Sequence, residues 1–195
     1  MSFLYYQDIR LFPDAELGAR EIGATLFNLL HQGFVKNKNE KGESKYALSF
    51  PAYSKGCAGS LGRIFRVFAY TKEFLEELDI FNICKKISGY AECSEIALVP
   101  KTSTYLRFYR IQKKTNKERL IRRTIKRKKL SEQEASDLYK DFSPQRLKPY
   151  PHLYIKSSST KQVFAIAINC KVETNSNPHG FSMYGLSTGG NIPDF

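Results

Sequence analysis

The stretch from Phe3 to Gly33, FLYYQDIRLFPDAELGAREIGATLFNLLHQG, contains two patterns that decide how the chain begins to fold. Apolar and polar residues alternate from Phe3 to Phe12, which predicts a strand. The Pro13-Asp14 pair that follows is a turn and helix-start signal. After it, apolar residues recur at helical spacing, and Gly33 supplies a C-terminal stop. These apolar residues are Leu17, Ile22, Leu26, Phe27, Leu29 and Leu30.

The next elements repeat this order. Tyr46–Phe50 and Arg63–Tyr70 read as two strands. Thr71 is suited to cap a second helix that runs to about Ile87, with Phe81 among its inward-facing residues. Glu95–Val99 then forms a short strand. The resulting order is strand, helix, strand, strand, helix, strand, which is the split βαβ arrangement of ferredoxin-like domains. RNA-recognition domains use the same order, but their aromatic signature is missing from this sequence.

The character of the chain changes after about Lys101. Thr104–Gln112 is an extended stretch, and Thr115 with Glu118 forms the Thr-x-x-Glu pattern of a capping box that begins a helix. Ser131 and Glu134 form a second such box. Two strands follow, at Leu153–Lys156 and Gln162–Cys170. We therefore expect an α+β fold in which a ferredoxin-like domain, residues 1–101, precedes a smaller α+β domain, residues 102–195, that carries an arginine-rich helix.

The composition agrees with a folded protein. Its 195 residues are 42% hydrophobic and 13% aromatic, which allows a sizeable core and argues against disorder. No apolar run is long enough to span a membrane, and Met1–Arg10 lacks the pattern of a signal peptide. We therefore expect a cytoplasmic protein.

Positive charge is concentrated in the segment from Arg107 to Lys129. This segment contains a single acid, Glu118, and it accounts for almost all of the formal net charge of +12. Such a stripe is the electrostatic footprint expected for a partner with a phosphate backbone, although a solvated helix face would also fit. Its basic residues are Arg107, Arg110, Lys113, Lys114, Lys117, Arg119, Arg122, Arg123, Lys126, Arg127, Lys128 and Lys129.

A helix over Lys117–Lys129 has two faces. At 100° per residue, five cationic residues fall within an arc of about 140°. They are Arg119, Arg122, Arg123, Lys126 and Arg127. Leu120, Ile121, Thr124 and Ile125 lie opposite. Arginine holds phosphates or guanine edges in a bidentate fashion, so this face suits a groove of nucleic acid. Because side chains seldom reach into the narrow major groove of continuous RNA duplex, an RNA partner would be a short hairpin. Charge alone does not distinguish such an RNA from B-DNA as the partner.

Metal and thiol chemistry have little support in the sequence. The acids are scattered and form no D-x-D pair, so a two-metal nuclease site is not indicated. The four cysteines include no C-x-x-C pair, and the three histidines do not cluster with them. We therefore expect no metal and no cofactor, and ordinary buried thiols in a reducing compartment.

RNA can be cleaved without a metal ion, since the ribose 2′-OH can attack the adjacent phosphate once a base takes its proton. Histidine is the side chain best suited to this near neutral pH. His31 lies near the predicted end of the first helix, where an imidazolium is stabilised. By itself, however, a histidine at this position fits a structural role as well. Ser157–Thr160, which includes Ser159, could likewise contact phosphates or simply form a polar hairpin turn.

Several segments, taken together in order and spacing, resemble the type I-F CRISPR repeat-processing endoribonucleases along almost the whole chain. They are Asp8-Ile-Arg-Leu-Phe-Pro-Asp14, Leu26-Phe-Asn-Leu-Leu-His31-Gln32, Ser49-Phe-Pro51, Arg110-Ile-Gln112, Glu118-Arg-Leu-Ile-Arg-Arg123, Leu130-Ser-Glu-Gln-Glu-Ala135, Ser157 to Phe164, and Tyr184-Gly-Leu-Ser-Thr-Gly-Gly190. The resemblance implies a ferredoxin-like first half and an arginine-rich helix that enters the major groove of the repeat hairpin. It also implies metal-independent cleavage just 3′ of the stem, which gives a 2′,3′-cyclic phosphate and a retained product.

The resemblance assigns roles to individual residues. His31 falls on the family's catalytic histidine, a proton-transfer residue at the scissile phosphate. Ser157 falls on the serine that holds the nucleophilic ribose, and Tyr184 on the tyrosine that supports the histidine. The residues expected to bind RNA are Arg110 and Gln112 at base edges, Phe164 beneath the terminal base pair, and Lys113, Arg119, Arg122, Arg123, Lys126, Arg127, Ser159 and Thr160.

Some positions depart from the family pattern. Lys126 stands where members usually have arginine, which would exchange a bidentate contact for a single phosphate contact. Lys128 and Lys129 add charge at the end of the helix. These departures bear on which hairpin is read.

Three hypotheses follow. The first is a repeat-specific endoribonuclease that stays bound to its product as a subunit of an interference complex. The second is a non-catalytic subunit of the same fold that binds an RNA hairpin or assists assembly, and the third is a basic DNA-binding regulator. The joint presence of His31, Ser157 and Tyr184 favours the first, because binding alone would not require them.

Overall fold

The computed structural model describes residues 2–40, 42–55, 59–112, 116–143, 150–157 and 161–195. Contacts divide the chain into two compact units. The larger unit comprises Met1–Ile111 and Pro149–Phe195, and the smaller unit comprises Gln112–Lys148. The division expected from the sequence stays a prediction: a ferredoxin-like domain over residues 1–101 and a domain with the arginine-rich helix over residues 102–195. The fold is α+β, as predicted, with two antiparallel sheets.

The first sheet of the larger unit orders its strands β2-β3-β1-β4, and all pairings are antiparallel. Its strands are β1 (Tyr5–Leu11), β2 (Tyr46–Ser49), β3 (Ile64–Ala69) and β4 (Ala91–Cys93), with β5 (Ala97–Leu98) pairing to the start of β1. The first three lie within the predicted strands. The fourth strand, β4, lies earlier in the sequence than the strand predicted at Glu95–Val99, of which only Ala97–Leu98 forms a strand.

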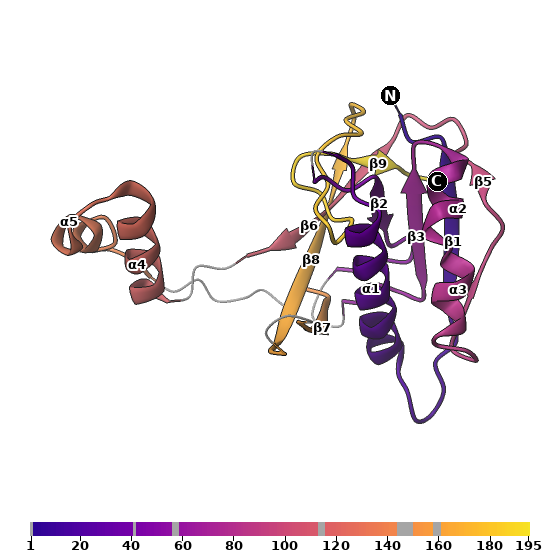
Figure 1. Ribbon diagram of the computed structural model, residues 1–195, viewed down its shortest axis with the longest axis horizontal. Coiled ribbons are helices and arrows are strands. Elements are labelled where there is room, and N and C mark those ends of the chain that lie inside the picture. The colour runs from indigo at the N-terminus through magenta and orange to yellow at the C-terminus, as the bar shows by residue number, and fades with distance from the viewer. Residues whose placement is uncertain (1, 41, 56–58, 113–115, 144–149, 158–160) are drawn as a thin grey trace. The chain divides into compact units, whose positions relative to one another are not determined.

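Three helices cover one side of this sheet (Figure 1). They are α1 (Ala19–Lys36), α2 (Lys72–Leu78) and α3 (Ile80–Lys85). Gly23 of α1 lies against Phe65 and Leu11, so the helix approaches the sheet closely where it lacks a side chain. The buried side chains of α1 recur with helical spacing, which is why the sequence pattern predicted this helix.

Helix α1 does not end at Gly33, contrary to the sequence prediction. It continues to Lys36, and the backbone N–H of Asn37 closes its last turn on the Gly33 carbonyl. A Cβ at position 33 would lie only 2.7 Å from Cδ1 of Leu78. The glycine therefore serves close packing of α2 onto α1 and not helix termination. As a result, His31 lies more than a turn before the helix end, where the terminal dipole acts only weakly.

The predicted second helix is two helices. Asp79 adopts a left-handed conformation with φ of 52°, which ends α2, and its side chain then caps α3 by accepting from the Asn82 N–H. The cap by Thr71 is confirmed. The break turns Phe81 outward, with 59% of its surface exposed, although the helical pattern had placed it inside. Its ring lies under the Lys85 ammonium, 4.5 Å from the centroid.

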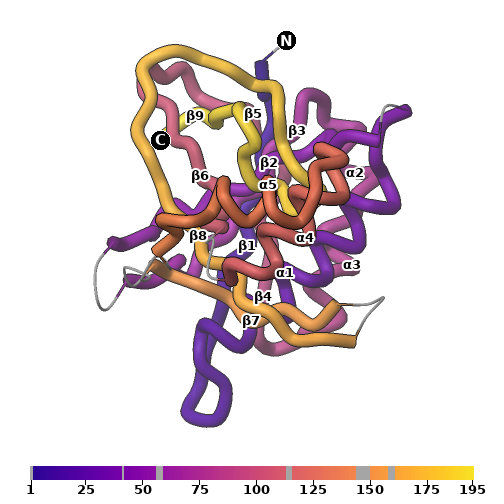
Figure 2. Tube along the Cα trace, turned by 90° about the vertical axis from the view of Figure 1, so that its left-hand side faces the viewer, coloured from indigo at the N-terminus to yellow at the C-terminus, as the bar shows by residue number. Residues whose placement is uncertain are grey.

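The second sheet of the larger unit orders its strands β7-β8-β6-β9. They are β6 (Tyr105–Ile111), β7 (His152–Lys156), β8 (Val163–Glu173) and β9 (Ile192–Pro193). Figure 2 traces β7 and β8 as an orange hairpin. Phe50, which follows β2, packs edge-on against Phe108 of β6 at 5.3 Å between ring centroids. The two sheets therefore share one hydrophobic core.

The smaller unit is a pair of helices, α4 (Lys117–Lys128) and α5 (Glu132–Asp137). The cap of α4 is Asn116 and not Thr115, the residue expected, which lies outside the described residues. Ser131 and Glu134 form the predicted capping box of α5. Thr124 of α4 is buried, and its hydroxyl lies 2.8 Å from that of Tyr139.

Within the part of the chain that the structure describes, no helix combines the length and the apolar character needed to cross a membrane.

Candidate active site and nucleic-acid interface

The imidazole of His31 has a defined orientation. It is half-buried on α1, and its Nδ1 lies 2.7 Å from the backbone carbonyl oxygen of Met183. Because a carbonyl oxygen can only accept, Nδ1 carries the hydrogen in this contact. In the neutral ring the lone pair is then on Nε2. This arrangement presents one nitrogen, Nε2, for proton exchange.

Tyr184 covers one face of the same imidazole. The two rings are stacked, with centroids 4.0 Å apart and an angle of 15° between their planes. The ring of Tyr184 also stacks on that of Phe27, at 5.6 Å between centroids and 11° between planes. Phe27 and His31 are four residues apart on α1 and so lie on one helix face. The structure thus brings together His31 and Tyr184, two of the three residues predicted for catalysis.

Sequence reasoning missed Met183 and Phe27. Met183 acts through its backbone carbonyl, which every residue possesses, so no side-chain pattern could reveal it. Phe27 is fully buried and was assigned to the helix core, which is correct. Its stacking on Tyr184 depends on a contact between residues far apart in the sequence, and helical periodicity carries no information about such contacts.

The loop that carries Met183 and Tyr184 is held at several points. Within the loop, the Ser182 N–H donates to the Leu186 carbonyl and the Gly185 N–H to the Ser182 carbonyl, both at 2.8 Å. The Ser187 N–H donates to the Phe108 carbonyl of β6.

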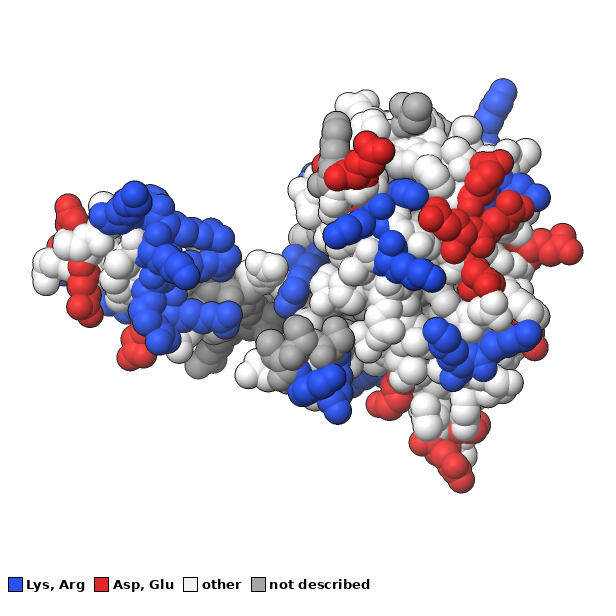
Figure 3. Space-filling view, in the orientation of Figure 1, with Lys and Arg blue, Asp and Glu red and all other residues white. Residues whose placement is uncertain are grey.

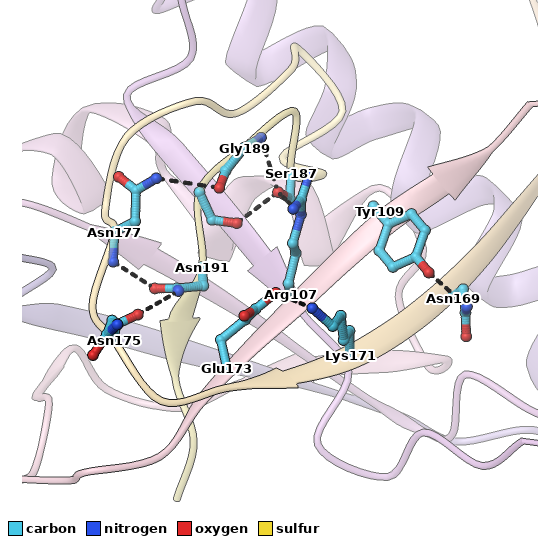
Figure 4. A network of polar contacts seen from close by, with 11 residues as sticks. Arg107, Tyr109, Asn169, Lys171, Glu173, Asn175, Asn177, Ser187, Gly189 and Asn191 are labelled. Carbon is cyan, nitrogen blue, oxygen red and sulfur yellow. Dashed lines mark hydrogen bonds and ion pairs between the residues drawn. The ribbon is translucent and has the colours of Figure 1, made fainter.

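Hydrogen bonds of side chains hold the rest of the chain between Asn175 and Asn191 (Figure 4). Asn191 accepts from the Asn177 N–H and donates to the Asn175 carbonyl, each at 2.7 Å. The Ser187 hydroxyl donates to the Gly190 carbonyl and accepts from the Arg107 guanidinium. Arg107, counted in the basic segment, is therefore engaged in holding this loop.

Ser157, the third predicted catalytic residue, directly follows β7, the strand that packs against α1. Its backbone N–H donates to the Gln162 carbonyl, and its carbonyl accepts from the Lys161 N–H. Lys161 has a φ of 59°, so the chain turns sharply here. These two hydrogen bonds hold Ser157 beside Lys161 and Gln162, and a contact between this segment and phosphate stays a prediction. Ser159 and Thr160 lie outside the described residues.

Arg110 and Phe164 lie close together. Arg110 is on β6 opposite Ile168 of β8, and its guanidinium carbon lies 5.5 Å from the centroid of the Phe164 ring. Its Nε is buried and, within the described parts of the chain, has no hydrogen-bond partner. A buried donor without an acceptor is unfavourable, which is consistent with a partner supplied by a ligand. Gln112 lies exposed one residue past β6, and Lys113 falls outside the described residues.

Helix α4 presents the predicted cationic face. Arg119, Arg122, Arg123, Lys126 and Arg127 are all exposed, and Thr124 on the opposite side is buried. The four ion pairs found between described residues include none of these cations. Figure 3 shows their blue side chains gathered over this helix. Cations that lie on one face without acidic partners repel one another, so this surface favours binding of a polyanion.

Two of the described cysteines, Cys84 and Cys170, lack the properties of nucleophiles. Burial raises the pKa of Cys84 to about 12 and that of Cys170 to about 11, so both thiols stay protonated near neutral pH. Cys93 is half-buried, and Cys57 lies outside the described residues. Among the described residues, no group of three or more His, Cys, Asp or Glu side chains is arranged to hold a metal ion.

Comparison with known proteins identifies relatives along nearly the whole chain. The family model described as CRISPR-associated protein (Cas_Csy4) matches residues 6–195. A protein of Pseudomonas aeruginosa (strain UCBPP-PA14), named CRISPR-associated endonuclease Cas6/Csy4, is 33% identical over 192 residues, which cover 98% of this chain and 99% of the relative. A protein of Escherichia coli (strain UTI89 / UPEC) with the same name is 30% identical over 192 residues, with the same coverage of both chains.

Proposed function

The chain belongs to the family of CRISPR-associated Csy4 proteins, and on this basis we propose that it is an endoribonuclease that processes CRISPR precursor RNA. It cleaves at the 3′ base of the repeat hairpin and stays bound to the mature guide RNA as a subunit of the type I-F interference complex. The two relatives are named endonucleases, which supports the activity. The observation that carries the proposal for this chain is the His31 imidazole, fixed by Met183 and stacked on Tyr184.

The proposed reaction needs no metal ion. The 2′-OH of the nucleotide at the cleavage site attacks the adjacent phosphorus, and the P–O5′ bond breaks. The products are a 2′,3′-cyclic phosphate and a 5′-OH, and one proton passes from the 2′-oxygen to the leaving 5′-oxygen overall. His31 exchanges this proton through Nε2, because Nδ1 is occupied by the Met183 carbonyl. Ser157 holds the ribose, and Tyr184 keeps the imidazole in its plane.

RNA binding is assigned to three groups of residues. The exposed cations of α4 contact the groove and backbone of the hairpin. They are Arg119, Arg122, Arg123, Lys126 and Arg127. Arg110 and Gln112 read base edges low in the stem, and Phe164 stacks beneath the terminal base pair. The stacked position of Arg110 and Phe164 supports a shared site for the last base pair. Lys113, Ser159 and Thr160 belong to this proposal from the sequence alone.

The larger unit provides the scaffold in this proposal. We infer that its first sheet and helices form a ferredoxin-like domain, because the strand order β2-β3-β1-β4 with two crossing helical connections is the one that a split βαβ arrangement generates. The second half of the chain then carries the arginine-rich helix that grips the hairpin.

A cleavage assay tests this function. The protein is incubated, in excess chelator, with its repeat RNA and with a copy carrying one 2′-deoxy nucleotide at the cleavage site. We expect the ribose substrate to be cut to a cyclic phosphate and the deoxy substrate to stay intact. Cleavage of both substrates would exclude attack by the 2′-OH, and cleavage of neither would refute the proposed nuclease.

A variant separates catalysis from binding. His31→Ala should abolish cleavage while the affinity for the hairpin stays nearly unchanged, because the imidazole acts on the phosphate and contributes little to holding the stem. A matching loss of affinity would instead identify His31 as structural. A protein that binds equally well with or without His31 but never cleaves would be a non-catalytic subunit.

A further inference from the structure

The turn that carries Met183 and Tyr184 fits onto α1 through a contact that only glycine permits. Gly185 has a φ of +69° and is buried. A Cβ at this position would lie 2.8 Å from Cε2 of Phe34 and 2.9 Å from Cβ of Leu48. Side chains with a Cβ strongly disfavour this φ, and real Cβ atoms do not approach other atoms so closely. Position 185 therefore excludes a side chain for two independent reasons.

The atoms that Gly185 approaches cannot easily move. Phe34 and Leu48 are 0% and 1% exposed, and both belong to the hydrophobic core. In addition, the Gly185 carbonyl accepts from the Leu48 N–H at 2.8 Å, which fastens the turn to the edge strand β2. Because packed cores give way only at a cost, a side chain at position 185 would displace the turn and not the core.

The same turn positions the two groups that contact His31, the Met183 carbonyl and the Tyr184 ring. Phe27, His31 and Phe34 lie four and three residues apart on α1, so they form one continuous face of the helix. Tyr184 stacks on the first two of these residues, and Gly185 rests against the third. A shift of the turn at Gly185 therefore moves the Met183 carbonyl and the Tyr184 ring relative to His31.

We propose that Gly185 is a positioning residue, which fixes the tautomer of His31 by allowing the Met183 carbonyl to reach Nδ1. This inference rests on the proposed function, in which His31 exchanges a proton with the RNA through Nε2. Without the carbonyl at 2.7 Å, the hydrogen distributes between the two ring nitrogens and the ring can rotate. Gly185 does not touch the substrate in this scheme, and its effect is entirely on the imidazole.

The test compares two glycine variants of the full chain. Gly185→Ala introduces the methyl group, and Gly189→Ala is the matched control, since a Cβ at position 189 meets nothing within 4 Å. Nitrogen-15 NMR of the histidine side chains reports which nitrogen of His31 carries the hydrogen. We expect wild-type protein and Gly189→Ala to show the hydrogen on Nδ1, and Gly185→Ala to show a mixture of tautomers.

Cleavage provides the second readout. Gly185→Ala should cleave about tenfold to a hundredfold more slowly, the loss expected when a reacting group is misplaced by an ångström or less. Its affinity for the hairpin should be unchanged, and the pH dependence of its rate should shift, which a general loss of folded protein would not produce. An unaltered tautomer, or an unaltered rate and pH profile, in folded Gly185→Ala would overturn the proposal.

A second variant decides the question should Gly185→Ala not fold. Phe34→Leu keeps the glycine and replaces the aromatic edge on which it rests with another core residue of moderate size. We expect a partial loss of the Nδ1 tautomer and a smaller loss of rate, and an unchanged tautomer would overturn the proposal. If the wild-type protein does not cleave RNA, the proposed function fails, while the NMR comparison still decides whether Gly185 fixes the imidazole.

Discussion

The hydroxyl contact between Thr124 and Tyr139 should determine whether the basic helix α4 is formed before RNA arrives. Thr124 is 9% exposed, and its Oγ1 lies 2.8 Å from the Tyr139 hydroxyl oxygen. Ala135 of α5, which is fully buried, packs in the same small unit. Through these contacts, α5 and the residues that follow it support α4.

Helix α4 needs such support because of its own charge. Among Arg119, Arg122, Arg123, Lys126 and Arg127 there are five pairs of cations spaced three or four residues apart. Like charges at this spacing destabilise a helix by roughly 0.2 to 0.5 kcal/mol each, so the five pairs together cost about 1 to 2.5 kcal/mol. A helix of 12 residues is marginal in water even without this repulsion.

Removing one hydroxyl should therefore have a measurable effect. Tyr139→Phe leaves the buried Thr124 hydroxyl without this partner, which costs about 1 to 2 kcal/mol. Replacing both partners, in Thr124→Val with Tyr139→Phe, removes the unsatisfied group and should cost less than the two single changes added together. The expected signature is a coupling of about 1 kcal/mol.

Amide hydrogen exchange of α4 is the direct assay. Tyr139→Phe should speed exchange throughout this helix and leave exchange in the larger unit unchanged. The effect should shrink at high salt, because ions screen the repulsion between the exposed cations. The affinity for the repeat hairpin should fall in proportion to the loss of formed helix. Unchanged exchange in α4, or additive effects in the double variant, would refute the role given to this contact.

Three further predictions concern other parts of the chain. Lys126→Arg should strengthen hairpin binding by about 0.5 to 1 kcal/mol in a filter-binding assay, because a guanidinium can hold a phosphate with two hydrogen bonds; equal or weaker binding would contradict the proposed phosphate contact. Gly62→Ala should lower the free energy of unfolding by about 1 to 3 kcal/mol more than Gly89→Ala does, which thermal unfolding measures. Both glycines have a positive φ, but of the two only Gly62 has backbone atoms within 3 Å of a new Cβ. Equal losses of stability would show that φ alone matters. Hydrogen bonds from Ser131 lower the pKa of the Glu134 carboxyl below that of an ordinary glutamate. This capping box should therefore support α5 above the ordinary pKa and lose its contribution as the pH falls through the lower pKa of the folded state. If α5 helicity declined with pH equally in Ser131→Ala, this reasoning would be wrong.

Local sequence patterns predicted most of the elements correctly. The helical spacing of apolar residues located α1, and alternation from Phe3 to Phe12 located β1, because each pattern reflects one buried face. Where the patterns misled, a tertiary contact was responsible. Gly33 looked like a helix stop but lies inside α1, since Leu78 packs where its side chain would be. Phe81 fitted a helical face, yet Asp79 breaks the helix before it and turns it outward.

The candidate site shows the same division. Charge counting and the helical wheel located the cationic face of α4, because exposure on one helix depends only on local periodicity. Composition by itself could not distinguish a catalytic His31 from a structural one. The resemblance of ordered segments to the type I-F nucleases supplied the hypothesis for His31, Ser157 and Tyr184.

By itself, the sequence determined the positions of α1 and of most strands, and the two faces of the basic helix. These features follow from residues that are neighbours along the chain. Only the tertiary structure decided that the Met183 carbonyl meets His31 across 152 positions, and that Gly185 leaves the room for it. The physical reason is that a backbone carbonyl and a missing Cβ carry no side-chain signature, and they gain a role only when the folded chain places them against an imidazole.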